Sequence, residues 1–316
     1  MAGKMGRTGL GFWAAAGLAA LTLAGCESTP PAVAPSAPAE TAPLPPPETP
    51  ASAALRAYFA QVQASLLSQD LLRTDMGGED APFTDRNLAE NFLRIAFYQE
   101  FDRSGLARSA SAGATPLTRW VEPIRVSLQF GASVPPEKRA TDSARIASFL
   151  ARLSALTGHP ITMVDRDPNY WIHIASVDER AALGPALSAV LTEATPAQIQ
   201  AATQMDRNTY CQVLTQSDPA TSTYNTAVVV IPSEHADLMR LACIHEELAQ
   251  SLGLPNDSNA ARPSIFNDDE EYALLTRQDE LMLKMLYNPA LRPGMSEAEA
   301  RPIVQSLASR LMGGDS

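Results

Sequence analysis

The sequence has no run of lysine or arginine residues, and its 24 basic residues are outnumbered by 35 acidic ones, giving a formal net charge of -11. Nucleic-acid binding depends on basic patches that replace the counterions around phosphate groups. We therefore exclude nucleic acid as a partner. Removal of an N-terminal leader carrying Lys4 and Arg7 would take the charge from -11 to -13, since two positive charges are lost.

The sequence also lacks several motifs that are typical of enzyme active sites. The chain has no GxSxG nucleophile elbow and no Ser-x-x-Lys motif, so no serine-hydrolase triad is predicted. It also has no glycine-rich phosphate loop and no internal repeat. The histidines His159, His173, His235 and His245 are scattered at spacings that predict no metal site, and we expect them in the core or on the surface.

The N-terminus lacks an apolar run of the roughly 20 residues that a transmembrane helix needs. Its apolar segment covers only residues 10–23 and follows Lys4 and Arg7, a pattern typical of a secretory signal peptide. The segment ends in Leu-Ala-Gly-Cys at residues 23–26, which resembles the bacterial lipobox. The resemblance implies cleavage before Cys26 and acylation of that cysteine, which anchors a protein stably to a membrane. An ordinary secretory signal or a permanent transmembrane helix is the alternative.

The residues after Cys26 indicate a spacer. Glu27 stands where an aspartate would resemble an inner-membrane retention signal, so we expect an outer-membrane protein that faces the periplasm. Residues 26–52 are nearly all Pro, Ala, Ser, Thr and Glu, and this composition cannot bury a core. We therefore predict a signal peptide over residues 1–25, a disordered tether over 26–52 and one globular domain over 53–316.

The globular part mixes helical and strand patterns, which predicts a mixed sheet flanked by helices in a single α/β domain. Alternating apolar residues predict a strand over residues 123–130, and apolar runs predict strands over 170–175 and 226–232. Helical spacing predicts helices over residues 55–72, 84–101, 140–156, 233–252, 276–286 and 297–311, with a shorter helix capped by Asp178.

Only two cysteines remain if Cys26 carries lipid. Disulfides persist in the oxidising envelope compartment, so we predict a bond between Cys211 and Cys243. Two buried free thiols are the alternative.

The helix expected over residues 233–252 carries the clearest chemical signal. His245 and Glu246 begin the HExxH pattern of zinc peptidases, in which two histidines one helical turn apart hold the metal. Ala249 occupies the second ligand position, and a methyl group cannot bind zinc. With the frame shifted by one residue, residues 246–256 resemble the metzincin pattern HExxHxxGxxH.

In this register Glu247 matches the general base and Gly253 matches the glycine. The three zinc-binding histidines are replaced by Glu246, Gln250 and Asn256, with Asp257 beside the last. Phe266 stands where metzincins carry a methionine beneath the metal. Zinc sites use mainly imidazole and thiolate ligands, whereas amide oxygens bind zinc poorly. The resemblance therefore implies a metzincin-like fold without a metal or another cofactor.

A closer resemblance covers residues 80–296. The segments 246–250, 252–257, 264–269 and 291–295 resemble a family of proteobacterial lipoproteins catalogued as domain of unknown function 2927. The resemblance implies no established activity.

These observations together predict a lipid-anchored envelope protein with a pseudo-peptidase-like domain that serves for binding or scaffolding without catalysis. We expect a cleft formed by Glu246, Gln250, Asn256 and Asp257 to bind a periplasmic protein, a peptide or an envelope polymer without cutting it. The alternative is a hydrolase that uses a nonstandard metal site, or Glu247 alone as its general base.

Overall fold

The computed structural model describes residues 46–99, 114–267 and 269–313. The predicted signal peptide, Cys26 and the tether as far as residue 45 lie outside these residues. Within the described part, no helix combines the length and the apolar character that a membrane span requires. The described residues belong to one folded unit, in agreement with the single predicted domain.

One sheet organises the fold. Its strands follow the order β1–β6–β4–β2–β3, and β5 also pairs with β6. The strands are β1 (Arg119–Trp120), β2 (Ile124–Phe130), β3 (Ile161–Met163), β4 (Tyr170–Ala175), β5 (Gln212–Asp218) and β6 (Thr223–Pro232). All pairings are parallel except that of β5, which runs antiparallel to β6. The predicted mixed sheet is therefore confirmed.

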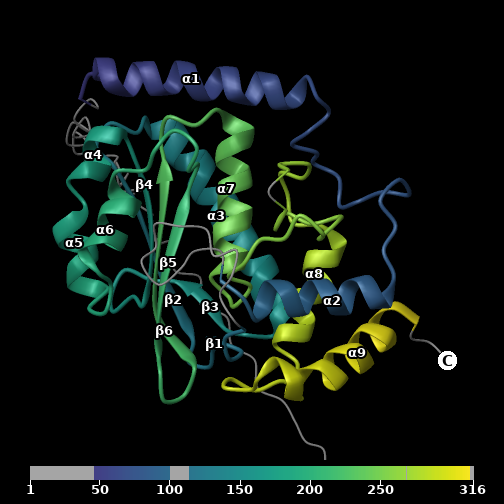
Figure 1. The fold of residues 1–316 in the computed structure, drawn as a ribbon. Coiled ribbons are helices and arrows are strands. Elements are labelled where there is room, and N and C mark those ends of the chain that lie inside the picture. The colour runs from purple at the N-terminus through teal and green to yellow at the C-terminus, as the bar shows by residue number, and fades with distance from the viewer. Residues whose placement is uncertain (1–45, 100–113, 268, 314–316) are drawn as a thin grey trace, which may run out of the picture. The chain divides into compact units, whose positions relative to one another are not determined.

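Helices cover both faces of this sheet (Figure 1). They are α1 (Pro50–Leu67), α2 (Asp85–Ala96), α3 (Pro136–Thr157), α4 (Val177–Ala181), α5 (Gly184–Val190), α6 (Pro196–Thr203), α7 (Asp237–Gln250), α8 (Arg277–Leu286) and α9 (Glu297–Gly313). Helices α5 and α6 lie on one side of the strands, and α3 and α7 lie on the other (Figure 1).

Strand β6 is apolar along its length because both of its faces are covered. Val229 and Ile231 belong to the main core with α3 and α7, whereas Val228 and Val230 pack against α5 and α6. A strand that is buried on both faces is a continuous apolar run in sequence. This explains why the sequence predicts β6 so clearly.

Four helix starts differ from the expected positions, and one of them is that of α3, which begins at Pro136 rather than at residue 140. Helix α1 begins at Pro50 with Thr49 as its N-cap, so it includes residues 50–52 of the expected tether. The Asp178 cap is wrong, because Ser176 caps α4 through a capping box with Glu179. Helix α7 begins at Asp237 rather than at residue 233, because residues 233–236 form the turn that follows β6.

The polar stretch between residues 196 and 218 also contains regular structure that the sequence analysis missed. It contains α6 and β5, and β5 forms a hairpin with β6. The two strands pair from Gln212↔Val230 to Asp218↔Thr223, with a register irregularity between Gln216 and Ser217. Strands β4 and β5 both pair with residues 227–230 of β6, so they occupy its opposite edges.

Candidate functional site

A cavity of about 450 Å³ lies between β5, the C-terminal half of α7 and the chain that follows α7. Glu246, Glu247 and Gln250 line it from α7, and Asp257 lines it from the following turn. The structure thus brings together four of the five residues that the sequence analysis assigned to a cleft or a catalytic role. We call this cavity the α7–β5 cleft.

The polar groups of α7 are mostly shielded at the cleft. Glu247 and Gln250 are each only 5% exposed, and Glu246 is half-buried. The Gln250 side-chain amide donates a hydrogen bond of 3.0 Å to Oδ1 of Asp257. This bond joins the end of α7 to the next turn, and the Gln250 amide serves as a hydrogen-bond donor to a carboxylate.

Asn256 is the exception among the proposed cleft residues. Its side-chain amide donates a hydrogen bond of 2.9 Å to the carbonyl oxygen of Arg94 at the end of α2, and Asn256 does not line the α7–β5 cleft. Asn256 therefore fixes the turn after α7 against α2.

Three aromatic side chains hold the C-terminal end of α7 in place. The Trp120 indole donates to the Ser251 carbonyl oxygen at 2.9 Å, and the Tyr170 hydroxyl lies 2.8 Å from the Ser251 hydroxyl. The Tyr287 hydroxyl donates to the Leu252 carbonyl oxygen at 3.1 Å. These bonds satisfy backbone and side-chain groups at the helix end, where carbonyl oxygens lack helical partners. They fix α7 relative to β1, β4 and α8.

Gly253 permits the close packing beyond this helix end. Its φ is +125°, and a Cβ atom there would lie 2.4 Å from the Thr118 carbonyl oxygen. Gly253 is therefore required here by its backbone conformation and by its close contact with the segment that leads into β1.

The loop on the far side of the cleft is held by a buried carboxylate. Asp279, at the start of α8, accepts hydrogen bonds from the Ser264 hydroxyl at 2.6 Å and from the Ile265 amide at 3.1 Å. Burial raises the pKa of Asp279 to about 6, although these hydrogen bonds oppose the shift. Phe266, two residues after Ser264, is fully buried in the core.

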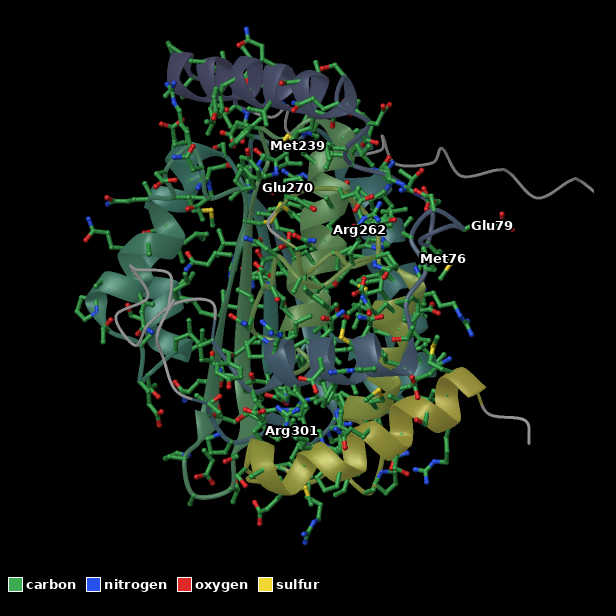
Figure 2. The ribbon with its side chains drawn as sticks, turned by 45° about the vertical axis from the view of Figure 1, so that its right-hand side comes forward. Met76, Glu79, Met239, Arg262, Glu270 and Arg301 are labelled. Atoms are coloured by element: carbon green, nitrogen blue, oxygen red, sulfur yellow. A yellow bond between two sulfur atoms is a disulfide. The ribbon has the colours of Figure 1, made fainter. Side chains whose placement is uncertain are left out.

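The cleft is acidic. Five carboxylate residues line it, and the described lining includes no lysine or arginine; the five are Asp206, Glu246, Glu247, Asp257 and Glu270. Glu270 lies on the loop near α7, well away from Glu79 on the outer loop (Figure 2). No group of three or more His, Cys, Asp or Glu side chains in the described ranges is arranged to hold a metal ion.

Two buried polar atoms at the cleft have no hydrogen-bond partner among the described residues. They are Oε1 of Gln212, on β5, and the hydroxyl of Tyr272. Their residues are only 7% and 4% exposed. Buried polar groups in folded proteins almost always have a partner, so each of these atoms is available to a water molecule or to a ligand in the cleft.

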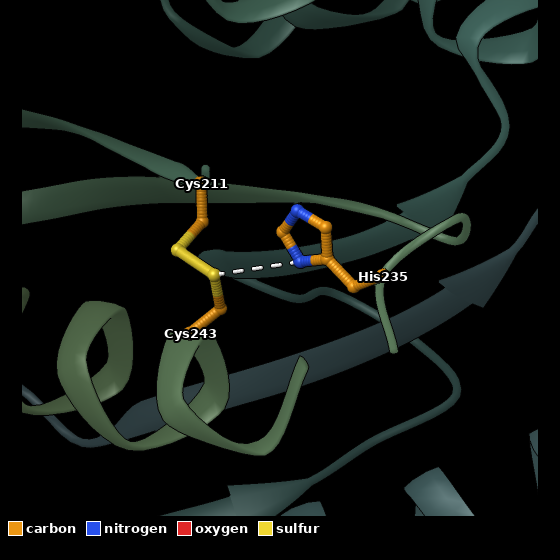
Figure 3. The surroundings of a disulfide bond; sticks show 3 residues. All are labelled: Cys211, His235 and Cys243. Atoms are coloured by element: carbon orange, nitrogen blue, oxygen red, sulfur yellow. Dashed lines mark hydrogen bonds between the residues drawn. A yellow bond between two sulfur atoms is a disulfide. The ribbon is translucent and has the colours of Figure 1, made fainter. Parts of the chain in front are cut away.

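The predicted disulfide is present. Cys211 and Cys243 are bonded, with their Cα atoms 5.9 Å apart, and Cys211 lines the cleft directly before β5. Nδ1 of His235 lies 3.7 Å from Sγ of Cys243 (Figure 3). The bond fastens the start of β5 to the middle of α7, so the two walls of the cleft are covalently joined.

His245 is a core histidine, as expected. Its ring stacks on Phe149 at a centroid distance of 3.9 Å, and its Nδ1 accepts a hydrogen bond of 3.1 Å from the Leu275 amide. Burial lowers the pKa of His245 to about 3, so the ring is neutral.

The β5 wall of the cleft was not predicted from the sequence. Its signals were the β-branched residues Val213 and Thr215 and the short turn before β6, which together are typical of a hairpin. Gln212 and Tyr272 could not have been found, because they reach the cleft from segments distant in sequence from α7.

Comparison with known proteins identifies one family. The family model described as "Protein of unknown function (DUF2927)" matches residues 85–306, which include α7, β5 and every cleft residue named above. Searches of the curated proteins and of the solved structures found no match.

Proposed function

The chain belongs to the DUF2927 family of proteins of unknown function, and from this premise we propose that it binds an extended polypeptide in the α7–β5 cleft without cutting it. The proposal includes descent of the cleft from a metzincin-like peptidase and lipid anchoring of the protein at Cys26 in the cell envelope.

The course of the cleft along β5 supports a polypeptide ligand. The five consecutive residues 211–215 all line the cleft. Because alternate residues of a strand point to opposite faces, a cavity that meets all of them runs along the strand edge. In the described part of the chain β5 pairs only with β6. Its other edge can therefore accept backbone hydrogen bonds from an added strand.

The chemistry of the cleft wall supports a basic side chain on that ligand. Five carboxylates surround the cavity, and the opposite charge of an arginine or a lysine complements such a surface. The side-chain oxygen Oε1 of Gln212 can accept a hydrogen bond, and the Tyr272 hydroxyl can accept or donate one. A peptide that carries a guanidinium group offers donors to both.

The same residues argue against zinc-dependent cleavage. Gln250 uses its amide to bind Asp257, and Asn256 uses its amide to bind Arg94, so two of the three ligand positions serve as structural donors. In the register that begins at His245, the second ligand position is Ala249, whose side chain has no atom that can bind a metal. Without a Lewis acid, Glu247 alone supplies neither an activated water nor charge stabilisation for the transition state.

Calorimetric titration of the full chain in detergent tests the proposal. The probes are terminally blocked heptapeptides of alternating threonine and valine with Arg, Gln or Glu in the centre. We expect the Arg peptide to bind most tightly and the Glu peptide to bind least. Tyr272→Phe should weaken binding of the Arg peptide about fivefold, the loss of one net hydrogen bond.

Two variants that each remove one negative charge distinguish the effect of the cleft on binding from the effect of the protein's overall negative charge. Glu246→Gln removes a charge within the cleft, and Glu79→Gln removes the same charge from an exposed outer loop (Figure 2). We expect only Glu246→Gln to weaken the Arg peptide. Equal affinities for the three peptides, or equal effects of the two variants, would contradict the proposal.

A further inference from the structure

A second crevice lies at the opposite end of α7, outside the carboxyl ends of the parallel strands. Strand β2 leads through α3 to its neighbour β3, whereas β4 leads through α4, α5 and α6 toward β6. The connections that leave β2 and β4, which are adjacent strands, therefore go in opposite directions. In open α/β sheets such a switch point forms a crevice in which ligands bind.

The crevice at this switch point has a volume of about 700 Å³. Its walls are the first turns of α3, α4 and α7 and the chain that enters α1. The side chains of Pro46, Pro47 and Pro135 contribute an apolar part of the lining. It shares no lining residue with the α7–β5 cleft and is independent of the function proposed for that cleft.

Lys138 lines this crevice from the first turn of α3. Its Nζ donates a hydrogen bond of 2.6 Å to the Ser233 carbonyl oxygen, at the end of β6, and this is its one hydrogen bond among the described residues. This hydrogen bond holds the Lys138 amine next to the carboxyl end of β6. Lys138 is half-buried, so its amine is partly shielded from water while it borders the cavity.

The surroundings of Lys138 favour its neutral form. Burial, followed by the positive charges of Arg240 and Arg56, lowers the pKa of Lys138 to about 8, against weaker opposing effects of Asp142 and Glu234. Arg240 itself is held by Asp142 at 2.8 Å, so it stays in place beside the amine.

The carboxylates around the crevice are engaged with other groups. From the chain that enters α1, Glu48 pairs with Arg56 at 2.7 Å; from α4, Asp178 accepts from the Thr49 hydroxyl at 2.5 Å. Asp237 pairs with Arg145 at 2.7 Å, and Glu179 accepts from the Ser133 and Ser176 hydroxyls at 2.7 and 2.8 Å. Glu137, beside Lys138, occupies an exposed position on the same helix. None of these carboxylates forms an ion pair with Lys138 in the described structure.

We propose that Lys138 is a nucleophilic amine and that the crevice binds small aldehydes or ketones, which Lys138 converts to imines. The neutral amine attacks the carbonyl carbon, and the proton that the nitrogen loses passes to the carbonyl oxygen to give a carbinolamine. Loss of water then leaves the C=N bond, so amine and carbonyl yield imine and one water without any oxidant or reductant. The reaction is reversible.

The composition of the chain makes this proposal simple to test. Its only lysines are Lys4, Lys138 and Lys284, and Lys284 is exposed on α8. At pH 7.5 roughly a quarter of the Lys138 amine is neutral, against about one in a thousand for an ordinary lysine. Lower basicity reduces the nucleophilicity of each neutral amine, so we expect a net rate advantage of about tenfold.

The experiment treats the full chain in detergent with propanal and cyanoborohydride, which traps imines as stable secondary amines. Mass spectrometry of proteolytic peptides then gives separate labelling rates for Lys138 and Lys284. We expect Lys138 to react about tenfold faster at pH 7.5 and its rate to level off above pH 8. Lys138→Arg should fold normally and lose only the label at this position.

Labelling of Lys138 at or below the rate of Lys284, or a rate at Lys138 that keeps rising steadily to pH 10, would overturn the proposal. Both results come from the unmutated protein, so they do not depend on the folding of a variant.

Discussion

At the scale of single residues, burial decides which titratable groups can act at neutral pH. His245 lies against Phe149 in the core, and His173 is also buried, with its pKa lowered to about 4 by burial. Neither ring lines the α7–β5 cleft. The histidines of this protein therefore affect its stability in acid rather than the chemistry of the cleft.

His245 provides a test of this view. Its pKa is about 3 in the folded state and about 6.5 when unfolded, so only the unfolded state gains a proton as the pH falls below 6.5. The free energy of unfolding must therefore fall with acidification, by about 2 kcal/mol between pH 7 and pH 5 from this residue. His245→Asn keeps a hydrogen-bond acceptor and should reduce the pH-dependent loss by that amount in urea denaturation. The same loss in both proteins would contradict the assignment.

Gly253 tests how closely the turn after α7 packs. Gly253→Ala should destabilise the protein by about 3 kcal/mol or more, because the added Cβ would clash with the Thr118 carbonyl oxygen 2.4 Å away. Gly158→Ala is the matched control, since Gly158 has a φ of +68° but an added Cβ there would meet no atom within 4 Å. We expect the control to cost about 1 kcal/mol, the strain of the left-handed conformation alone. Thermal unfolding of both variants measures the difference.

At the scale of elements, the α7–β5 cleft depends on two segments joined by one covalent bond. Helix α7 is fixed at its C-terminal end by Trp120, Tyr170 and Tyr287, and β5 is fixed at its start by the disulfide. The outer edge of β5 has no partner strand in the described residues. The disulfide therefore limits how far β5 can move away from α7.

Replacing both Cys211 and Cys243 by serine should lower the free energy of unfolding by about 3 to 4 kcal/mol, since the bond joins residues 32 positions apart and closes the loop between them. We also expect weaker binding of the Arg peptide, because β5 loses its attachment to α7. Guanidinium unfolding and titration of the double variant measure the two effects. An unchanged free energy of unfolding would mean that the disulfide constrains neither the folded nor the unfolded chain.

The elements that the sequence predicted share a physical property with those that it did not. Strands β4 and β6 are mostly buried and show apolar runs, β2 alternates and buries Ile124 and Val126, and α2 begins at its expected cap, Thr84. Strand β5 is half-polar because its edge faces the cleft, so its residues carry no strong periodicity. The short helices α5 and α6 are stabilised by packing against β6, although α6 also carries a local signal in the capping box of Thr195 and Gln198.

The sequence likewise predicted only part of the candidate site. The helical spacing of residues 246–250 placed Glu246 and Gln250 on one side of α7, and in the structure both line the same cavity as Asp257. Asn256 instead points toward α2, where its amide binds the Arg94 carbonyl oxygen, whereas its neighbour Asp257 lines the cleft. Gln212 and Tyr272 join the site only through tertiary packing.

At the scale of the whole molecule, the N-terminal sequence predicts where the domain works. The lipobox-like residues 23–26 and the proline-rich segment after them are typical of a protein held at a membrane surface by a spacer. In bacteria fed an alkyne fatty acid, the protein should become labelled and remain in the membrane fraction. Cys26→Ser should abolish the label, whereas Ser28→Ala, nearby in the same segment, should not. A labelled Cys26→Ser protein would contradict lipid attachment at this cysteine.

The central claim is that β5 receives an added polypeptide strand that α7 does not cut. Amide hydrogen exchange of residues 212–218, with and without saturating Arg-centred heptapeptide, tests it most directly when the peptide is recovered and weighed afterwards. We predict slower exchange across these residues and an intact peptide. Unchanged exchange in β5, or peptide fragments that disappear with Glu247→Gln, would contradict the account.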